Sequence, residues 1–263
     1  MPSKENRNSA AGTVPVLRKA NRVFEFVARS PSGATAKSLA ISLEIAPATC
    51  YRILRSFVAD GWLRQSTSGA FELSFGLVPL MRPLLRHEVL IETVRERLVE
   101  LAQRTGITAK LSIRQGDHHV TIFSAQSSRS HAVVSRVGAV GSLAVGSNGA
   151  AFLGAMPDAD VARIVNHAPP EAWKIQKRET VLRRVRDGRK LGCYFDNGSY
   201  QPNINSLSAP IFSPKREIAG VITLLGFPQD FAGVAKAALM RELKSTASNC
   251  SRLVQGSSVG ATT

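Results

Sequence analysis

The first part of the chain shows apolar residues at helical spacing in three consecutive segments. Intervals of three and four residues predict a helix over Val16–Ala28. Thr35 offers a side-chain oxygen that can cap a second helix over Ala36–Leu43. A third helix is predicted over Pro47–Ala59, because Pro is tolerated in a first helical turn and Asp60-Gly61 breaks the pattern. The segments follow one another with short breaks, as in a helix-turn-helix.

A hairpin is predicted directly after the third helix. Trp62–Gln65 and Ala70–Leu73 have the composition of two short strands, and the turn Ser66–Gly69 joins them. Helix, helix, turn, helix and hairpin in succession is the plan of a winged helix-turn-helix. We therefore expect this domain over residues 16–78.

The rest of the chain changes repeatedly between helix and strand periods. A longer amphipathic helix is predicted from about Leu84 to Arg104, and we assign residues 79–105 to a linker helix. Further strands are predicted at Thr108–Arg114, His119–Ala125, Ser130–Val137, Gly192–Asp196, Ser206–Phe212 and Ile218–Leu225. Further helices are predicted at Gly146–Ala155, Asp158–Asn166, Glu179–Lys190 and Phe231–Val254. The fold class is α+β, with a mixed domain over residues 106–255 and polar tails, expected to be disordered, at 1–15 and 256–263.

The charge balance favours a polyanionic partner but does not place it. The chain has 263 residues, with 34 Lys and Arg against 19 Asp and Glu. Such a surplus favours nucleic acid or a membrane surface, although a basic protein that binds neither is an alternative. Residues 1–83 carry 11 basic and 5 acidic residues, and the remainder is basic as well.

Several function classes are disfavoured by what the sequence lacks. Cys50, Cys193 and Cys250 are isolated, so a disulfide scaffold or a structural zinc site is not expected. No apolar run approaches the ~20 residues that span a membrane, and the N-terminus lacks the apolar core of a signal peptide. We expect a cytoplasmic protein with no metal and no cofactor.

The third predicted helix has two different faces. The inward face is apolar and consists of Cys50, Ile53, Leu54, Phe57 and Val58. The outward face is small, polar or basic and consists of Ala48, Thr49, Tyr51, Arg52 and Arg55. Small residues allow close approach to a major groove, while hydroxyl and guanidinium groups can contact phosphates or guanine edges. Thr35, Lys37 and Arg64 flank this face.

We therefore expect the outward face to bind double-stranded DNA. The alternative is a three-helix subdomain whose polar face is merely solvated, and the agreement of helix spacing, turn, hairpin and charge disfavours it.

The chain resembles the isocitrate lyase regulator (IclR) family of bacterial transcriptional regulators. The resemblance runs through AKSLAISLEIAPATCYRILRSFVADGWLRQSTSGAFELSFGL, SRVGAVGSLAVGSNGAAFLGAM and LGCYFDNGSYQPNINSLSAPIFSPKREIAGVITLLG, and covers nearly all of the chain after Val16. It implies a winged helix-turn-helix, a linker helix and a GAF-like effector domain. It also implies dimers or dimers of dimers on palindromic promoter sites, often of catabolic operons, with small organic acids or aromatic metabolites as effectors.

The resemblance also implies an effector pocket. The loop Gly141–Asn148 enters a predicted helix, whose first N–H groups attract a carboxylate. Residues at the family's effector-binding positions are Leu143, Ser147, Asn148, Asp196, Ser206, Thr223 and Leu225. Asp196 has an alternative interpretation as a turn or strand-end residue satisfied by the backbone.

This pocket lacks several polar side chains that the family usually carries. Ala144, Gly146 and Ala150 stand where the family commonly has His, Thr and Lys, and Ser206 and Leu225 stand for the usual Cys and Ser. Two interpretations follow: a larger or more apolar effector, such as an aromatic acid, or a regulator that binds DNA without any effector.

Two other features have simpler interpretations. His118-His119 follows Gly116-Asp117 and is assigned to a hairpin turn, since adjacent strand residues face opposite ways and make a poor metal site. The eight basic residues from Lys174 to Lys190 are interpreted as a solvated helix face, with a second DNA contact as the alternative.

An enzyme is disfavoured, because Cys193 stands alone and no paired acid and base groups are evident. The sequence does not decide between repressor and activator.

Overall fold

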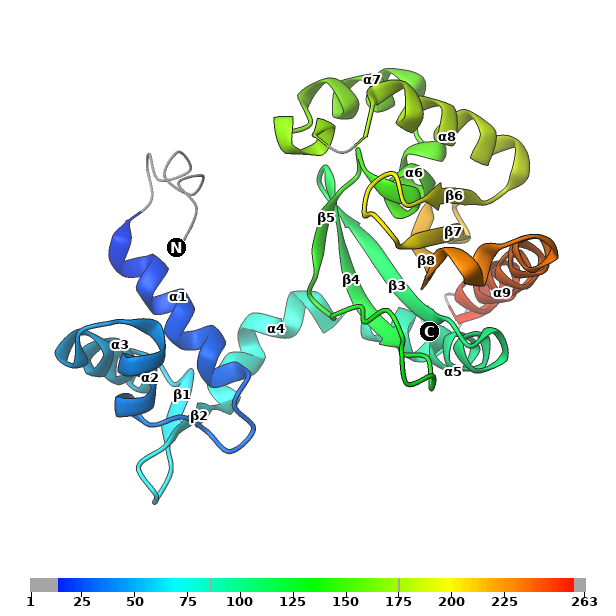
Figure 1. Cartoon of the computed structure of the whole chain (residues 1–263). Helices are drawn as coiled ribbons and strands as arrows, with labels where there is room; N and C mark the ends of the chain where they lie inside the picture. The colour runs from blue at the N-terminus through cyan, green and yellow to red at the C-terminus, as the bar shows by residue number, and fades with distance from the viewer. Residues whose placement is uncertain (1–13, 86, 175, 258–263) are drawn as a thin grey trace. The chain divides into compact units, whose positions relative to one another are not determined.

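The computed structural model describes residues 14–85, 87–174 and 176–257. The chain divides into two compact units, Met1–Leu85 and Arg86–Thr263 (Figure 1). The predicted tails fall mostly outside the described residues. Pro15 nevertheless belongs to the first helix, and the last helix continues to Ser257.

The first unit has the elements of a winged helix. Its helices are α1 (Pro15–Ala28), α2 (Ala36–Leu43) and α3 (Pro47–Ala59). The strands β1 (Leu63–Gln65) and β2 (Phe71–Leu73) pair antiparallel and form the wing. The bounds of α2 and α3 are those predicted from the sequence, and α1 begins one residue earlier than expected.

One apolar cluster holds this unit together. Val23 of α1, Leu39 of α2, Cys50 and Leu54 of α3, and Phe71 of β2 are all at most 1% exposed. Thr35 caps α2 as expected, since its Oγ1 accepts from the Ser38 N–H at 3.2 Å. The buried face of α3 is therefore committed to the core, and its other face is left for solvent or a ligand.

The predicted linker helix is two helices. A 3₁₀ turn, Phe75–Leu77, leads into α4 (Val78–Leu85), and α5 (Glu88–Thr105) begins the second unit. Gly106, in the left-handed conformation at φ 65°, ends α5.

The second unit is built on one six-stranded antiparallel sheet. Its strands are β3 (Thr108–Gln115), β4 (His118–Ala125), β5 (Val140–Ser142), β6 (Tyr194–Asn197), β7 (Asn205–Phe212) and β8 (Ile218–Gly226). They lie in the order β5-β4-β3-β8-β7-β6. The expected hairpin turn at Gly116-Asp117 joins β3 to β4, but His118 and His119, which were assigned to the turn, lie in β4 and pair with Gln115 and Arg114.

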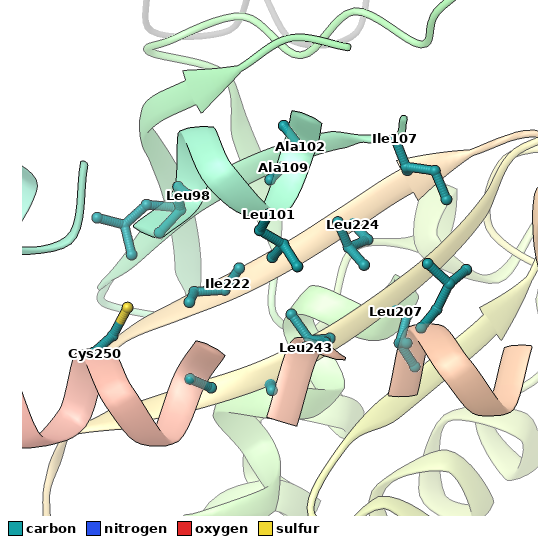
Figure 2. Packing of buried hydrophobic residues seen from close by; sticks show 14 of the residues in the cluster. Leu98, Leu101, Ala102, Ile107, Ala109, Leu207, Ile222, Leu224, Leu243 and Cys250 are labelled. Atoms are coloured by element: carbon teal, nitrogen blue, oxygen red, sulfur yellow. The ribbon is translucent and has the colours of Figure 1, made fainter. Parts of the chain in front are cut away.

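Helices cover both faces of this sheet (Figure 1). Helices α5 and α9 (Val234–Ser257) pack on one face, where Leu98, Leu101 and Leu243 meet Leu207 and Ile222 (Figure 2). Helices α6 (Gly146–Gly154), α7 (Asp158–His167) and α8 (Arg178–Leu191) form a second apolar cluster on the other side. The 3₁₀ turns Pro170–Trp173 and Pro228–Phe231 complete the connections.

One predicted strand is wrong. Residues 130–137 form no strand, and those from 130 to 135 make no hydrogen bond with described residues. The position beside β4 is taken by β5, with His119 opposite Gly141. Apolar content alone does not make a strand, because each strand needs a neighbour for its N–H and C=O groups. The other predicted strands and helices of this unit are present, with shifted ends.

Among the described residues, no helix is both long and apolar enough to cross a membrane.

Candidate DNA-binding helix and ligand cavity

The outward face of α3 is open to solvent. Ala48, Tyr51, Arg52 and Arg55 are exposed, and Thr49 is half-buried. The side chains of Arg52 and Arg55 make no hydrogen bond or ion pair with any residue that the structure describes. Two unpaired guanidinium groups on one exposed helix face are suited to phosphates and guanine edges.

The flanking residues differ in how free they are. Lys37 is exposed and has no partner in the described part of the chain. Arg64 forms a cross-strand ion pair with Glu72 at 2.5 Å, so its charge is partly neutralised. Thr35 is exposed, but its hydroxyl caps α2. Arg52 and Arg55 on this face and Lys37 beside it are therefore the basic groups that remain available.

The second unit contains a cavity of about 510 Å³ over the sheet face that α6 approaches. That volume lies within the ~300–1,000 Å³ of typical small-molecule sites. Six of the seven predicted effector residues line it: Ser147, Asn148, Asp196, Ser206, Thr223 and Leu225. Leu143, the seventh, is fully buried in the apolar cluster of α6, α7 and α8 and is not among the lining residues.

Four hydroxyl groups form a chain beneath the cavity. Ser147 Oγ lies 2.6 Å from Ser206 Oγ and 2.8 Å from Ser208 Oγ, and Ser208 Oγ lies 2.8 Å from Thr223 Oγ1. Three bonds use three of the four hydroxyl protons. The fourth proton has no acceptor within the chain, and three of the four residues, Ser147, Ser206 and Thr223, line the cavity.

Asp196 is held in a buried ion pair that the sequence analysis missed. Arg184 Nη2 donates to its Oδ1 at 2.5 Å, and both side chains are at most 5% exposed. The N–H groups of Ser199 and Tyr200 also donate to this carboxylate, at 3.2 and 3.3 Å. These contacts match the structural interpretation of Asp196, since they occupy most of its lone pairs.

Arg184 also fixes the start of α6. Its Nη1 donates to the Gly146 carbonyl at 3.3 Å, and its Nε donates to the Phe195 carbonyl at 3.0 Å. The basic run from Lys174 to Lys190 is therefore not uniformly solvated, since Arg184 turns inward. The period of α8 carried that signal, because Val181, Arg184, Val185 and Gly188 share its buried face.

Three basic residues of the cavity wall were missed as well. Lys110 of β3, His119 of β4 and the exposed Arg136 all line it. Burial lowers the pKa of Lys110 to about 8. Burial, together with the charges of Lys110 and His118, lowers the pKa of His119 to about 3, so this imidazole is neutral at physiological pH.

Neither a reactive Cys193 nor a metal-ligating cluster is present among the described residues. Cys193 is a buried free thiol whose pKa is raised by burial, which disfavours the thiolate. No group of three metal-ligating side chains is present in the described part of the chain.

Comparisons with known proteins decide the family. The sequence model of the IclR helix-turn-helix domain matches residues 16–67, and that of the bacterial transcriptional regulator IclR C-terminal domain matches residues 83–252. The chain belongs to the IclR family of bacterial transcriptional regulators. It is thus a regulator with a DNA-binding helix-turn-helix domain and a C-terminal effector-binding domain, not an enzyme.

Relatives of this IclR-family chain support the same conclusion. It is 26% identical over 219 residues to the HTH-type transcriptional regulator RhmR of Escherichia coli, covering 81% of this chain and 83% of that protein. It is 26% identical to the regulator BhcR of Paracoccus denitrificans, covering 82% and 78%. The crystal structure of IclR from Thermotoga maritima has the same fold, with a TM-score of 0.73 at 20% identity, covering 91% of this chain and 98% of that one.

Proposed function

We propose that this regulator recognises its operator through the outward face of α3. Arg52 and Arg55 are the principal readers, and Ala48, Thr49 and Tyr51 contact the groove or the phosphates beside them. The observation that carries this proposal is the pair of exposed guanidinium groups that no described residue neutralises. Thr35, Lys37 and Arg64 contribute contacts at the edges of the face.

The operator we expect is palindromic and is bound by a homodimer or a dimer of dimers. A two-fold symmetric protein presents its two reading helices to two half-sites, spaced by about one turn of DNA or a multiple of it. The regulated genes are those of a catabolic operon, and the protein acts in the cytoplasm, where that DNA lies.

We further propose that the cavity of the second unit binds a small organic or aromatic acid that changes the affinity for DNA. Three features of the cavity can bind an acid group: the hydroxyl groups that line it, the N–H groups at the beginning of α6, and the basic residues of its wall. A regulator that binds DNA independently of any effector is the competing function, favoured by the loss of the family's usual polar positions at Ala144 and Gly146.

A direct test uses DNA from upstream of the protein's own gene and a scrambled duplex of equal length. The expected result is preferential binding of the upstream DNA, with an affinity that falls steeply as salt rises, because bound phosphates release counterions. Equal affinity for both duplexes at every salt concentration contradicts the proposal. The addition of organic acids to the same assay then separates an effector-controlled regulator from an effector-independent one.

A further inference from the structure

Lys110 is a cation of the cavity floor that lacks an anionic partner. It stands in the middle of β3, opposite Thr223 of β8. Its Nζ has one hydrogen-bond partner among the described residues, Thr121 Oγ1 at 3.5 Å, and no carboxylate within ion-pair distance. A half-buried ammonium group in this situation has lost much of its hydration without receiving a counter-ion.

The charged groups around Lys110 leave the cavity with a net positive wall. His119 on β4 is neutral, because its pKa is lowered to about 3. Asp196 on β6 is the only carboxylate among the described lining residues, and Arg184 already neutralises it. Arg136, also in the wall, is exposed to water. Lys110 is therefore the half-buried charge of the site that no described residue balances.

Other polar groups of the same wall are also unsatisfied. His119 Nδ1 and Asn148 Oδ1 are buried and have no hydrogen-bond partner in the described part of the chain, and both residues are more than nine-tenths buried. Asn148 lies in the first turn of α6 and donates through Nδ2 to Ser112 Oγ at 2.9 Å. Thr223, at one end of the hydroxyl chain, shares the sheet face of its register partner Lys110. Hydrogen-bonding groups and one half-buried cation therefore line the same space.

Much of the remaining cavity wall is apolar, although Ser135, Tyr200 and Gln201 also line it. Its apolar side chains are those of Val133, Val134, Val140, Val145, Ile204, Leu225 and Phe227. A second acid group placed against them would be desolvated with no partner, whereas a hydrocarbon body would gain from burial.

We propose that Lys110 is the counter-ion of the effector's acid group, so that the cavity selects monocarboxylates with an apolar body. The inference rests on the proposed effector function and adds the chemical class of the ligand and the residue that selects it. Thr223 and the first turn of α6 donate to the same carboxylate, and the apolar wall covers the rest of the molecule.

The test compares three acids with their uncharged amides: benzoate, phenylacetate and hexanoate against benzamide, phenylacetamide and hexanamide. Thermal unfolding and calorimetry are performed on the full-length protein, on Lys110→Met, and on Lys215→Met, which removes the same charge at an exposed position outside the cavity. We expect at least one acid to bind and to raise the melting temperature of the wild type and of Lys215→Met, and its amide to do neither. In Lys110→Met, affinity for that acid should fall about 10- to 100-fold, the effect of a lost charge-assisted hydrogen bond.

Two further readouts separate a ligand contact from a merely structural role. Without ligand, Lys110→Met should melt no lower than the wild type, because it removes an unbalanced buried charge. At pH 8, acid binding to the wild type should take up about half a proton per site, measured in buffers of different ionisation enthalpy, since the free Lys110 has a pKa of about 8 and a bound carboxylate raises it. Lys110→Met should take up none.

The proposal is overturned if Lys110→Met binds the acids as tightly as the wild type, if the amides bind as tightly as the acids, or if no acid binds the wild type. Binding of upstream DNA by the same samples keeps the two proposals apart. Acid binding that survives Lys110→Met removes only the role of Lys110. Specific DNA binding whose affinity no acid changes contradicts effector control. Absence of specific DNA binding contradicts the proposed recognition of the operator by α3.

Discussion

Arg184 and Asp196 form a buried ion pair, 2.5 Å from Nη2 to Oδ1, at the edge of the ligand cavity. The same guanidinium holds the Gly146 carbonyl at the start of α6 and the Phe195 carbonyl of β6. The pair therefore positions both the helix start and the strand end that border the cavity. Its first role is organisation of the site, and Asp196 is not a free acceptor for a ligand.

Substitution Arg184→Met should destabilise the second unit strongly. Removal of one partner leaves the Asp196 carboxylate buried without a counter-ion, which costs about 3–5 kcal/mol. Urea unfolding measures the loss. Arg163→Met is the matched control, because Arg163 forms an exposed pair with Asp117 in the same unit. Equal losses in the two variants would contradict a special role for the buried pair.

Gly149 should not tolerate a side chain. A Cβ at this position of α6 would lie 2.2 Å from the Leu143 carbonyl oxygen, so Gly149→Ala must push the helix from the preceding loop. We expect a loss of about 1–3 kcal/mol, typical of overpacking. Gly256→Ala, with open space around its Cβ, should leave stability unchanged or slightly higher. A melting temperature for Gly149→Ala equal to that of the wild type would show that α6 is not packed as described.

His119 should make the protein less stable in mild acid. Its pKa is about 3 in the folded state against 6.5 for the ordinary group, because burial and the Lys110 charge oppose protonation. The unfolded chain then binds the extra proton between these values, so stability is retained above about pH 6.5 and lost as the pH falls, by about 1.4 kcal/mol per pH unit.

Urea unfolding at pH 7 and pH 5 tests this dependence. His119→Phe keeps a ring stacked on Phe152 and removes the titrating group. The variant should lose clearly less stability than the wild type between the two pH values. Parallel losses would mean that His119 is protonated in the folded protein.

Thr35 has two predicted roles that one substitution series can separate. Thr35→Ala should cost ~1 kcal/mol of stability, because Oγ1 caps α2 through the Ser38 N–H. Thr35→Asp should restore the cap and yet weaken DNA binding by charge repulsion if Thr35 lies near a phosphate. Anisotropy with labelled upstream DNA and thermal unfolding give the two readouts. Unchanged DNA affinity in Thr35→Asp would leave Thr35 only its capping role.

The winged helix was predictable because its signals are local. The bounds of α2 and α3 were predicted to the residue from the cap at Thr35, from Pro47 in a first helical turn and from the apolar spacing between them. The strand predicted at residues 130–137 is absent for the opposite reason. A strand depends on a neighbouring strand, and β5 occupies the position beside β4. Lys110 was missed because its burial arises from residues distant in sequence, whereas the inward position of Arg184 was signalled by the period of α8 and was overlooked.

The cavity was predicted less completely than helix α3. The resemblance to the family pointed to Ser147, Asn148 and Thr223, which do line the cavity, and also to Leu143, which packs in the core instead. Position in a family motif does not show which way a side chain turns. The partners of Asp196 likewise became evident only when α8 and β6 were placed side by side.

The central claim is that Arg52 and Arg55 on α3 read the operator. Fluorescence anisotropy with upstream DNA should be measured for the wild type, for Arg52→Ala and Arg55→Ala, and for Arg252→Ala, an exposed arginine of α9. We predict that Arg52→Ala or Arg55→Ala reduces specific affinity by about 1–3 kcal/mol where it contacts a base, with scrambled DNA affected less, and that Arg252→Ala has little effect. Wild-type affinity in both α3 variants would contradict the account.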